Sequence, residues 1–196
     1  MLGAGACVGL VALGGVSIAF ARDGELLRPP GGQDEVRLRA LCVKCDRCRS
    51  VCPRNCVEPA QVTDGLLEAR LPKLNFHRGY CDFCDKCIDA CPTGALTPFD
   101  PEVDKIGIAV VDKNSCIAYT RGACEVCKRS CQFDALVFDN ANRPTIREDL
   151  CNGCGECVMA CNVNANRTFD GRPEHAIEVV STVKHAADVS LTEVVS

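Results

Sequence analysis

One cysteine pattern occurs four times along this chain of 196 residues. The first copy reads Cys-x2-Cys-x2-Cys-x3-Cys-Pro over residues 42–53, and residues 81–92 repeat it without change. The third copy, residues 116–131, has seven residues in its first gap, and the fourth, residues 151–161, restores two. The chain holds 18 cysteines, about 9% of its residues, a density at which cysteine forms a framework. We therefore expect cross-links to supply part of the stability.

This spacing is the bacterial ferredoxin motif, in which three close thiolates hold one iron–sulfur cubane and the fourth reaches the other cluster of a pair. Four motifs therefore predict four [4Fe-4S] clusters. Small residues between ligands, such as Gly153 and Gly155, let the backbone approach a cluster, and Gly122 helps the long gap to loop out. The sixteen expected ligands are Cys42, Cys45, Cys48, Cys52, Cys81, Cys84, Cys87, Cys91, Cys116, Cys124, Cys127, Cys131, Cys151, Cys154, Cys157 and Cys161.

Structural zinc and disulfides are the alternatives for these cysteines. Zinc ligands normally come as separated Cys-x2-Cys pairs, and cysteines three apart on a tight loop seldom form a bridge, so four motifs in register favour iron–sulfur clusters. Only Cys7 and Cys56 are left over. We expect Cys56 to be a buried spare thiol, with a substitute ligand as the alternative. The histidines His77, His175 and His185 lie outside the motifs, and surface or capping roles are expected for them.

The charge pattern excludes several classes of function. The chain has 22 basic and 26 acidic side chains, a net charge of −4, and no basic stripe, so we do not expect a nucleic-acid partner. It also has no Ser/His/Asp set, no phosphate-binding glycine loop and no dinucleotide fingerprint. The sequence thus predicts an electron carrier without a catalytic site of its own.

The N-terminal part is expected to be an export segment. Residues 2–21 carry no charge, and Ala19-Phe20-Ala21 has the small-x-small pattern of a cleavage site. No Lys or Arg precedes Arg22, so we expect the true start to lie upstream of Met1. We divide the chain into an export segment (1–21), a linker (22–40) containing Arg28-Pro29-Pro30-Gly31-Gly32, a four-cluster region (41–180) and a tail (181–196).

Short strands and helical turns are expected around the cysteine loops. Strands are predicted at residues 106–111, 135–138, 144–146 and 176–180, and helical turns at residues 88–90 and 158–160. The fold class is therefore α+β, with two ferredoxin-like dicluster modules. The motifs pair either sequentially or in a nested order, first with fourth and second with third. We favour nesting because residues 53–80 are long and the least strand-like.

The chain resembles the NapG/MauM family of ferredoxin-type proteins. The resemblance rests on the order of the motifs, the seven-residue gap after Cys116 with the strand Ile106–Val110 before it, Cys91–Leu96, and Leu27–Gly31. It implies a periplasmic electron carrier, exported folded by the twin-arginine route and associated with the membrane. Electrons would enter from a membrane ferredoxin-type, quinol-oxidising protein and leave to a periplasmic cytochrome or reductase, in nitrate reduction or methylamine metabolism.

Two other functions remain open from the sequence. One is a four-cluster electron-transfer subunit of a molybdenum-type oxidoreductase complex. The other, from a different class, is a zinc- or disulfide-stapled binding module without redox activity.

Overall fold

The structure, a computed structural model, describes residues 26–122, 124–161 and 175–187. The expected export segment lies outside this range, as does most of the tail, of which residues 182–187 are helical. The remaining elements are all short. They are α2 (Glu35–Leu41), α3 (Arg47–Ser50), β1 (Val57–Pro59), the 3-10 turn η1 (Val62–Asp64), β2 (Pro72–Leu74), α4 (Lys86–Asp89), β3 (Ile108–Val111), α5 (Ile117–Thr120), the 3-10 turn η2 (Val126–Arg129), β4 (Leu136–Phe138), β5 (Pro144–Ile146), α6 (Glu156–Ala160) and β6 (Ile177–Val180).

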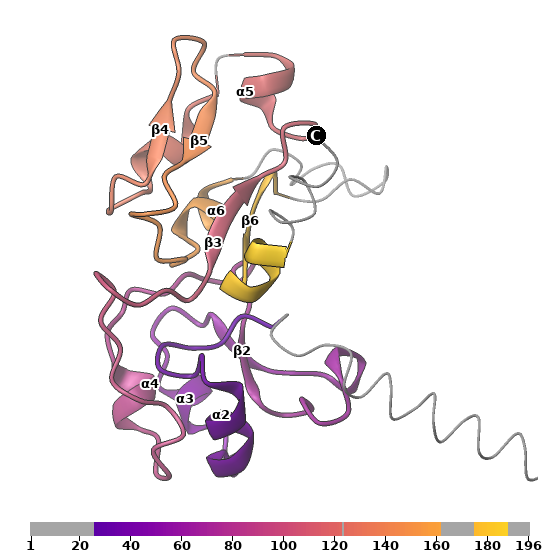
Figure 1. Ribbon diagram of the computed structural model, residues 1–196, viewed down its shortest axis with the longest axis vertical. Coiled ribbons are helices and arrows are strands. Elements are labelled where there is room, and N and C mark those ends of the chain that lie inside the picture. Colours follow the sequence, from indigo (N-terminus) through magenta and orange to yellow (C-terminus); the bar gives the residue numbers. More distant parts are fainter. Residues whose placement is uncertain (1–25, 123, 162–174, 188–196) are drawn as a thin grey trace, which may run out of the picture.

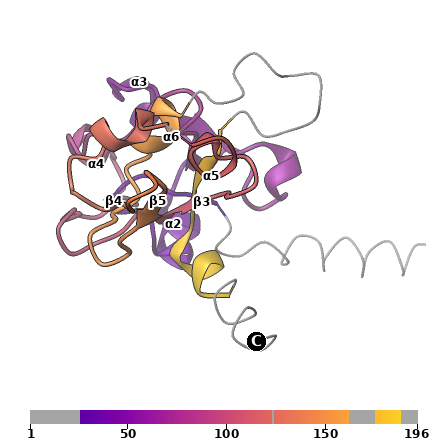
Figure 2. The same ribbon diagram turned by 90° about the horizontal axis from the view of Figure 1, so that it is seen from above.

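The elements form two lobes (Figure 1). The lower lobe holds α2, α3 and α4 with the antiparallel pair β1–β2, in which Val57 lies opposite Leu74. The upper lobe holds two more antiparallel pairs, β3–β6 and β4–β5, together with α5 and α6. Seen from above, the two lobes largely overlap, so they stack along the long axis of the molecule (Figure 2). The mixed helix and strand content agrees with the expected α+β class.

Each lobe contains two consecutive motifs, and the segment before the pair contacts the segment after it. In the upper lobe, β3 precedes the third motif and β6 follows the fourth, and Ile108 of β3 lies opposite Val180 of β6. In the lower lobe, the amide and hydroxyl of Thr97, after the second motif, donate to the carbonyl of Gly31, before the first, at 3.0 and 3.1 Å. Gly31 has φ +77°, and a Cβ there would lie 1.9 Å from the Thr97 carbonyl oxygen, so only glycine fits this close approach.

All four predicted strands are confirmed, and their ends differ from the predicted ends by at most two residues. Two further strands, β1 and β2, are not predicted by the sequence. Pairs β3–β6 and β4–β5 fall inside the predicted ranges. Strands β1 and β2 lie in residues 53–80, the part of the chain whose sequence is the least strand-like. Each has only three residues and contains a proline, so its sequence pattern is too short to detect, and pairing across the intervening loop forms it.

Residues 28–32, expected to be part of a linker, are packed into the lower lobe. Pro29 and Pro30 are fully buried, and Arg28 is 3% exposed. Helix α2 follows, with the Asp34 side chain accepting the amide N–H of Arg37 as an N-terminal cap at 3.0 Å. The expected linker therefore has a structural role up to the start of the first motif.

A hydrophobic core connects the two lobes. Leu74 and Phe76 of the lower lobe pack in one cluster with Ile108, Val158 and Ile177 of the upper lobe. No helix in the described ranges is both long and apolar enough to cross a membrane. The shared core packs the two lobes, and the cysteines that they carry, against each other.

Candidate iron–sulfur cluster sites

The cysteine loops share one backbone conformation. In the first, second and fourth motifs, the second residue after the first cysteine and the residue after the second cysteine are left-handed. These residues, with φ between 52° and 79°, are Lys44, Asp46, Phe83, Asp85, Gly153 and Gly155. Alternation of right- and left-handed residues turns successive amide N–H groups to one side and forms an anion-binding concavity. The third motif differs, because its long first gap forms α5 and then turns at Gly122, whose φ is +74°.

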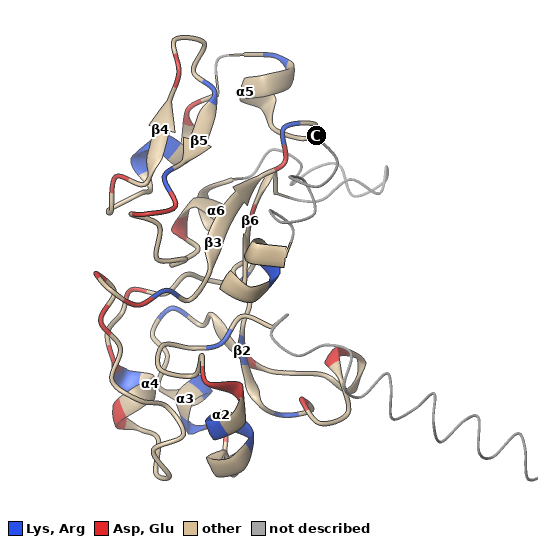
Figure 3. Ribbon diagram, viewed as in Figure 1, with Lys and Arg blue, Asp and Glu red and all other residues tan. Residues whose placement is uncertain are grey.

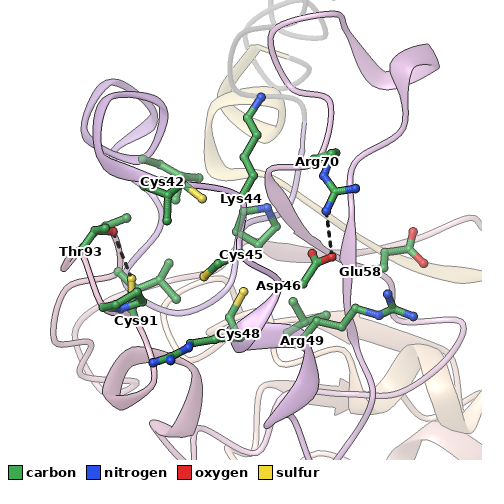
Figure 4. A pocket seen from close by; sticks show the side chains of 18 residues that line it. Cys42, Lys44, Cys45, Asp46, Cys48, Arg49, Glu58, Arg70, Cys91 and Thr93 are labelled. Atoms are coloured by element: carbon green, nitrogen blue, oxygen red, sulfur yellow. Dashed lines mark hydrogen bonds and ion pairs between the residues drawn. The ribbon is translucent and has the colours of Figure 1, made fainter.

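In the lower lobe, three cysteines of the first motif meet the last cysteine of the second. Cys42, Cys45, Cys48 and Cys91 line one pocket, and Figure 4 shows their sulfurs pointing into a common space. The Sγ of Cys91 lies 3.7 Å from the Thr93 hydroxyl. We call this pocket the first site.

In the same lobe, three cysteines of the second motif meet the last cysteine of the first. Cys81, Cys84 and Cys87 line a second pocket together with Cys52, the last cysteine of the first motif. We call this pocket the second site. Helices α3 and α4, which carry Cys48 and Cys87, are neighbours, so the first and second sites are adjacent.

The upper lobe repeats this exchange with the third and fourth motifs. Cys151, Cys154 and Cys157 line a pocket with Cys131, and we call it the fourth site. Cys116, Cys124 and Cys127 gather with Cys161 in the third site. The sixteen expected ligands thus fall into four groups of four.

The nested pairing favoured from the sequence is therefore wrong. The structure places the first motif with the second and the third with the fourth. The physical reason lies outside the cysteine loops: the Gly31–Thr97 contact and the β3–β6 pair each join the two ends of a consecutive pair of motifs. The spacing within a motif carries no information on these long-range contacts.

The fifth cysteine of the second site is Cys56, which is 1% exposed. Its sulfur lies 3.7 Å from that of Cys52. This contact lowers the pKa of Cys52 to about 5, because a thiol hydrogen bond stabilises the Cys52 thiolate. Cys56 is thus buried, as expected, and it also contacts a candidate ligand directly.

Backbone N–H groups donate to several candidate ligand sulfurs. The amide of Ala109 donates to Cys151 Sγ at 3.4 Å, that of Ala135 to Cys131 Sγ at 3.3 Å, and that of Ala176 to Cys161 Sγ at 3.3 Å. In iron–sulfur proteins such bonds offset the negative charge of a cluster and help to set its potential. The sulfur environment therefore fits an anionic cluster.

Burial raises the pKa of several of these thiols. The pKa values of Cys48, Cys81 and Cys127 are raised to about 12, with neighbouring cysteines adding to the effect of burial. None of the described cysteines is in a disulfide. Within the described ranges, no three His, Cys, Asp or Glu side chains form a site for a single metal ion. Four sulfurs around a pocket, with amide donors, fit a cubane as the occupant.

The lobes differ in how far they expose these sulfurs. Cys45 of the first site and Cys84 of the second are exposed, whereas most cysteines of the third and fourth sites are buried. The lobes also touch through the sites themselves, because the amide of Cys81 donates to the carbonyl of Cys154 at 2.8 Å. One hydrogen bond therefore connects the second site to the fourth.

The histidines lie away from the pockets of the first, second and fourth sites. His77 and His175 contact each other edge to face, with ring centroids 4.6 Å apart. His175 Nδ1 contacts the carbonyl of Cys161, the last cysteine of the fourth motif, and thus caps this backbone group. His185 Nε2 lies 3.0 Å from a carboxylate oxygen of Glu148. The exposed His77 and the contact of His175 agree with the expected surface and capping roles, whereas the His185 side chain is only 18% exposed.

Comparison with known proteins identifies the family. A family described as "4Fe-4S dicluster domain" matches residues 41–95, the first and second motifs, and a "4Fe-4S binding domain" matches residues 143–166. The chain is 30% identical to the ferredoxin-type protein NapF of Escherichia coli K12 over 143 residues, covering 71% of this chain and 82% of NapF. It is 32% identical to NapG of the same strain over 168 residues, covering 77% and 72%.

A third relative is the methylamine utilization ferredoxin-type protein MauM of Methylophilus methylotrophus. It is 29% identical over 155 residues, covering 72% of this chain and 68% of MauM. These relatives agree with the cysteine motifs and with the family resemblance found in the sequence. The chain belongs to the ferredoxin-type iron–sulfur proteins of the NapG/MauM family.

Proposed function

We propose that this iron–sulfur protein relays single electrons through four [4Fe-4S] clusters, one at each of the four sites. The observation that carries the proposal is the grouping of sixteen cysteines into four sets of four, each with three from one motif and one from its neighbour. Each cubane, when bound, accepts and gives back one electron. The chain would hold it with four thiolates and donate amide hydrogen bonds to its sulfurs.

The contacts between sites support an order that differs from the order along the chain. The first and second sites are neighbours through α3 and α4, and the third and fourth through η2 and α6. The hydrogen bond from Cys81 to Cys154 joins the second site to the fourth. We therefore propose the order first, second, fourth, third.

The experiment uses iron counting in pairs of variants. Four cubanes correspond to about sixteen irons and as much acid-labile sulfide in anaerobically purified protein. Cys45 and Cys91 line the same pocket. The Cys45→Ala protein, the Cys91→Ala protein and the double variant should therefore each lose about four irons. Cys45→Ala combined with Cys52→Ala should lose about eight, because these residues line different pockets.

Two results would overturn this assignment. A loss of about eight irons from the Cys45→Ala/Cys91→Ala protein would mean that these cysteines hold different clusters. Zinc without acid-labile sulfide would support the stapled binding module instead of an electron carrier.

The cellular setting is also a proposal. The uncharged residues 2–21 and the family support export in a folded state, with a membrane quinol-oxidising partner as donor and a periplasmic cytochrome or reductase as acceptor. The purified protein should stay oxidised with a quinol analogue and become reduced when membranes containing the partner are added. Rapid reduction by quinol alone would show that this chain has a quinol site of its own.

A further inference from the structure

The two exposed candidate ligands lie in loops of opposite charge. Around Cys45, the first motif carries Lys44, Arg47 and Arg49 against one acid, Asp46. Around Cys84, the second motif carries three acids, Asp82, Asp85 and Asp89, against one base, Lys86. The chain as a whole has a net charge of −4, so the basic loop stands out from an acidic background.

The positive charge of this loop is not neutralised by nearby acids. Lys44, Arg47 and Arg49 have no ion pair within the described residues. Asp46, the acid between them, is already paired with Arg70 at 3.3 Å. Arg70 and the labelled residues around the pocket are visible in Figure 4, where the Lys44 side chain extends away from the cysteine sulfurs.

The second nearby acid is also engaged. Glu58 lines the same pocket and accepts Lys73 at 3.5 Å and Arg78 at 3.7 Å. Figure 3 shows basic residues on α3 and α2 at the lower end of the molecule, with acidic residues beside them at the start of α2. Arg47 and Arg49 are exposed and Lys44 is half-buried, so the three bases of the first motif carry positive charge that nearby acids do not compensate.

The centre of this basic surface is apolar and contains a candidate cluster ligand. Val43, which lines the same pocket as Cys45, is 63% exposed, and Cys45 is itself exposed. A small apolar centre with a charged rim suits weak, short-lived electron-transfer contacts, in which charge complementarity speeds up encounter. An exposed ligand sulfur at the centre brings the redox group within a short distance of a docked protein.

We propose that the surface formed by Lys44, Arg47 and Arg49 around Cys45, the basic docking surface, binds a redox protein with a carboxylate-rich surface. The proposal rests on the proposed function, because it needs a cluster at the first site. An anionic membrane is the less suitable occupant, since lipid-binding clusters usually hold about four to eight basic residues. Only three bases that line this pocket lack an ion pair among the described residues, because Arg70 is paired with Asp46. Around Cys84, Asp82 is paired with Arg54 at 3.0 Å, which leaves Asp85 and Asp89 against Lys86. This loop does not attract the same partner, so charge favours the first site as the point of electron exchange.

The experiment measures electron transfer to an oxidised c-type cytochrome of net negative charge. The protein is reduced with dithionite, and the second-order rate constant is followed by stopped flow at low ionic strength. Lys44→Glu, Arg47→Glu and Arg49→Glu are combined in one variant. The matched control combines Lys113→Glu, Arg121→Glu and Arg129→Glu, at residues that are exposed and have no ion pair among the described residues; the change in charge is the same.

The docking variant should react at least about tenfold more slowly than the control variant, since electrostatic steering is worth ~10–10³ in association rate. Added salt should slow the wild type and remove the difference between the two variants. A variant with glutamine at the same three positions should fall between the wild type and the glutamate variant, and it guards against loss of folding.

Equal rates in the docking and control variants would overturn the proposal, as would a faster reaction of the wild type with a c-type cytochrome of net positive charge. Binding of the wild type, but not of the docking variant, to phosphatidylserine vesicles without an effect on the cytochrome rate would assign the surface to membranes instead. Iron content and reduction by dithionite are measured on every variant. If these fail in the wild type, the proposed function is wrong; if they hold, only the docking surface is in question.

Discussion

Arg28 joins the segment before the first motif to the rest of the lower lobe. Its Nε and Nη2 donate to the Glu35 carboxylate at 2.7 and 2.9 Å, and its Nη1 donates to the carbonyl of Pro72 at 3.0 Å. Its Nη2 also contacts the carboxylate of Glu68, a residue only 4% exposed. We expect Arg28→Met to destabilise this lobe, because it removes the cation and leaves the Glu68 carboxylate with less compensation.

The magnitude follows from the partners that remain. Removing one member of a buried ion pair costs ~3–5 kcal/mol of folding free energy. Glu68 keeps Arg39, whose Nη2 lies 2.7 Å from its carboxylate, so the lower end of the range, about 3 kcal/mol, applies. At ~1.4 kcal/mol per factor of ten, opening of the lower lobe should become about 100-fold more frequent.

The assay follows cluster release, because loss of the clusters makes unfolding irreversible. Under anaerobic conditions in guanidinium chloride, Arg28→Met should lose the iron of two clusters, those of the first and second sites, well before the rest. Arg28→Lys should be intermediate, since lysine keeps the charge but not the forked hydrogen bonds. Arg54→Met removes an exposed pair with Asp82 and should behave like the wild type. Release at the wild-type rate from the Arg28→Met protein would refute the reasoning.

Two further predictions concern the cysteines themselves. Cys56→Ala should lower the reduction potential of the second-site cluster without changing the iron content, because it removes the thiol donor 3.7 Å from Cys52, whereas Cys56→Ser keeps a hydroxyl donor and should stay close to the wild-type potential. Redox titration monitored by electron paramagnetic resonance measures the potential, and an unchanged potential in Cys56→Ala would contradict the prediction. Cluster assembly on the folded apo-protein should become more favourable from about pH 7 to about pH 9, because burial raises the pKa values of Cys48, Cys81 and Cys127 to about 12 and these thiols must lose their protons before iron binds. Iron uptake that does not depend on pH would exclude this linkage.

The sequence alone was sufficient for the local structure of the sites. The repeated spacing selected sixteen cysteines, and the structure gathers all of them into four groups. In the first, second and fourth motifs, local spacing works because three cysteines within seven residues converge from a tight loop, and this loop needs no distant contact to form. The strand at Ile108–Val111 and the turn at Gly122 were predictable for the same reason, since hydrophobic pattern and glycine act over a few residues.

Only the tertiary structure decided which fourth cysteine completes each site. Cys91 reaches the first site and Cys131 the fourth because Thr97 pairs with Gly31 and β3 pairs with β6, contacts that span most of a lobe. The same holds for Arg28, whose partner Glu68 lies 40 residues further along the chain, and this contact turns an expected linker into a buried anchor. Such contacts depend on the summed burial of distant segments, which a motif cannot encode, whereas the spacing of the candidate ligands within a motif depends only on neighbouring residues.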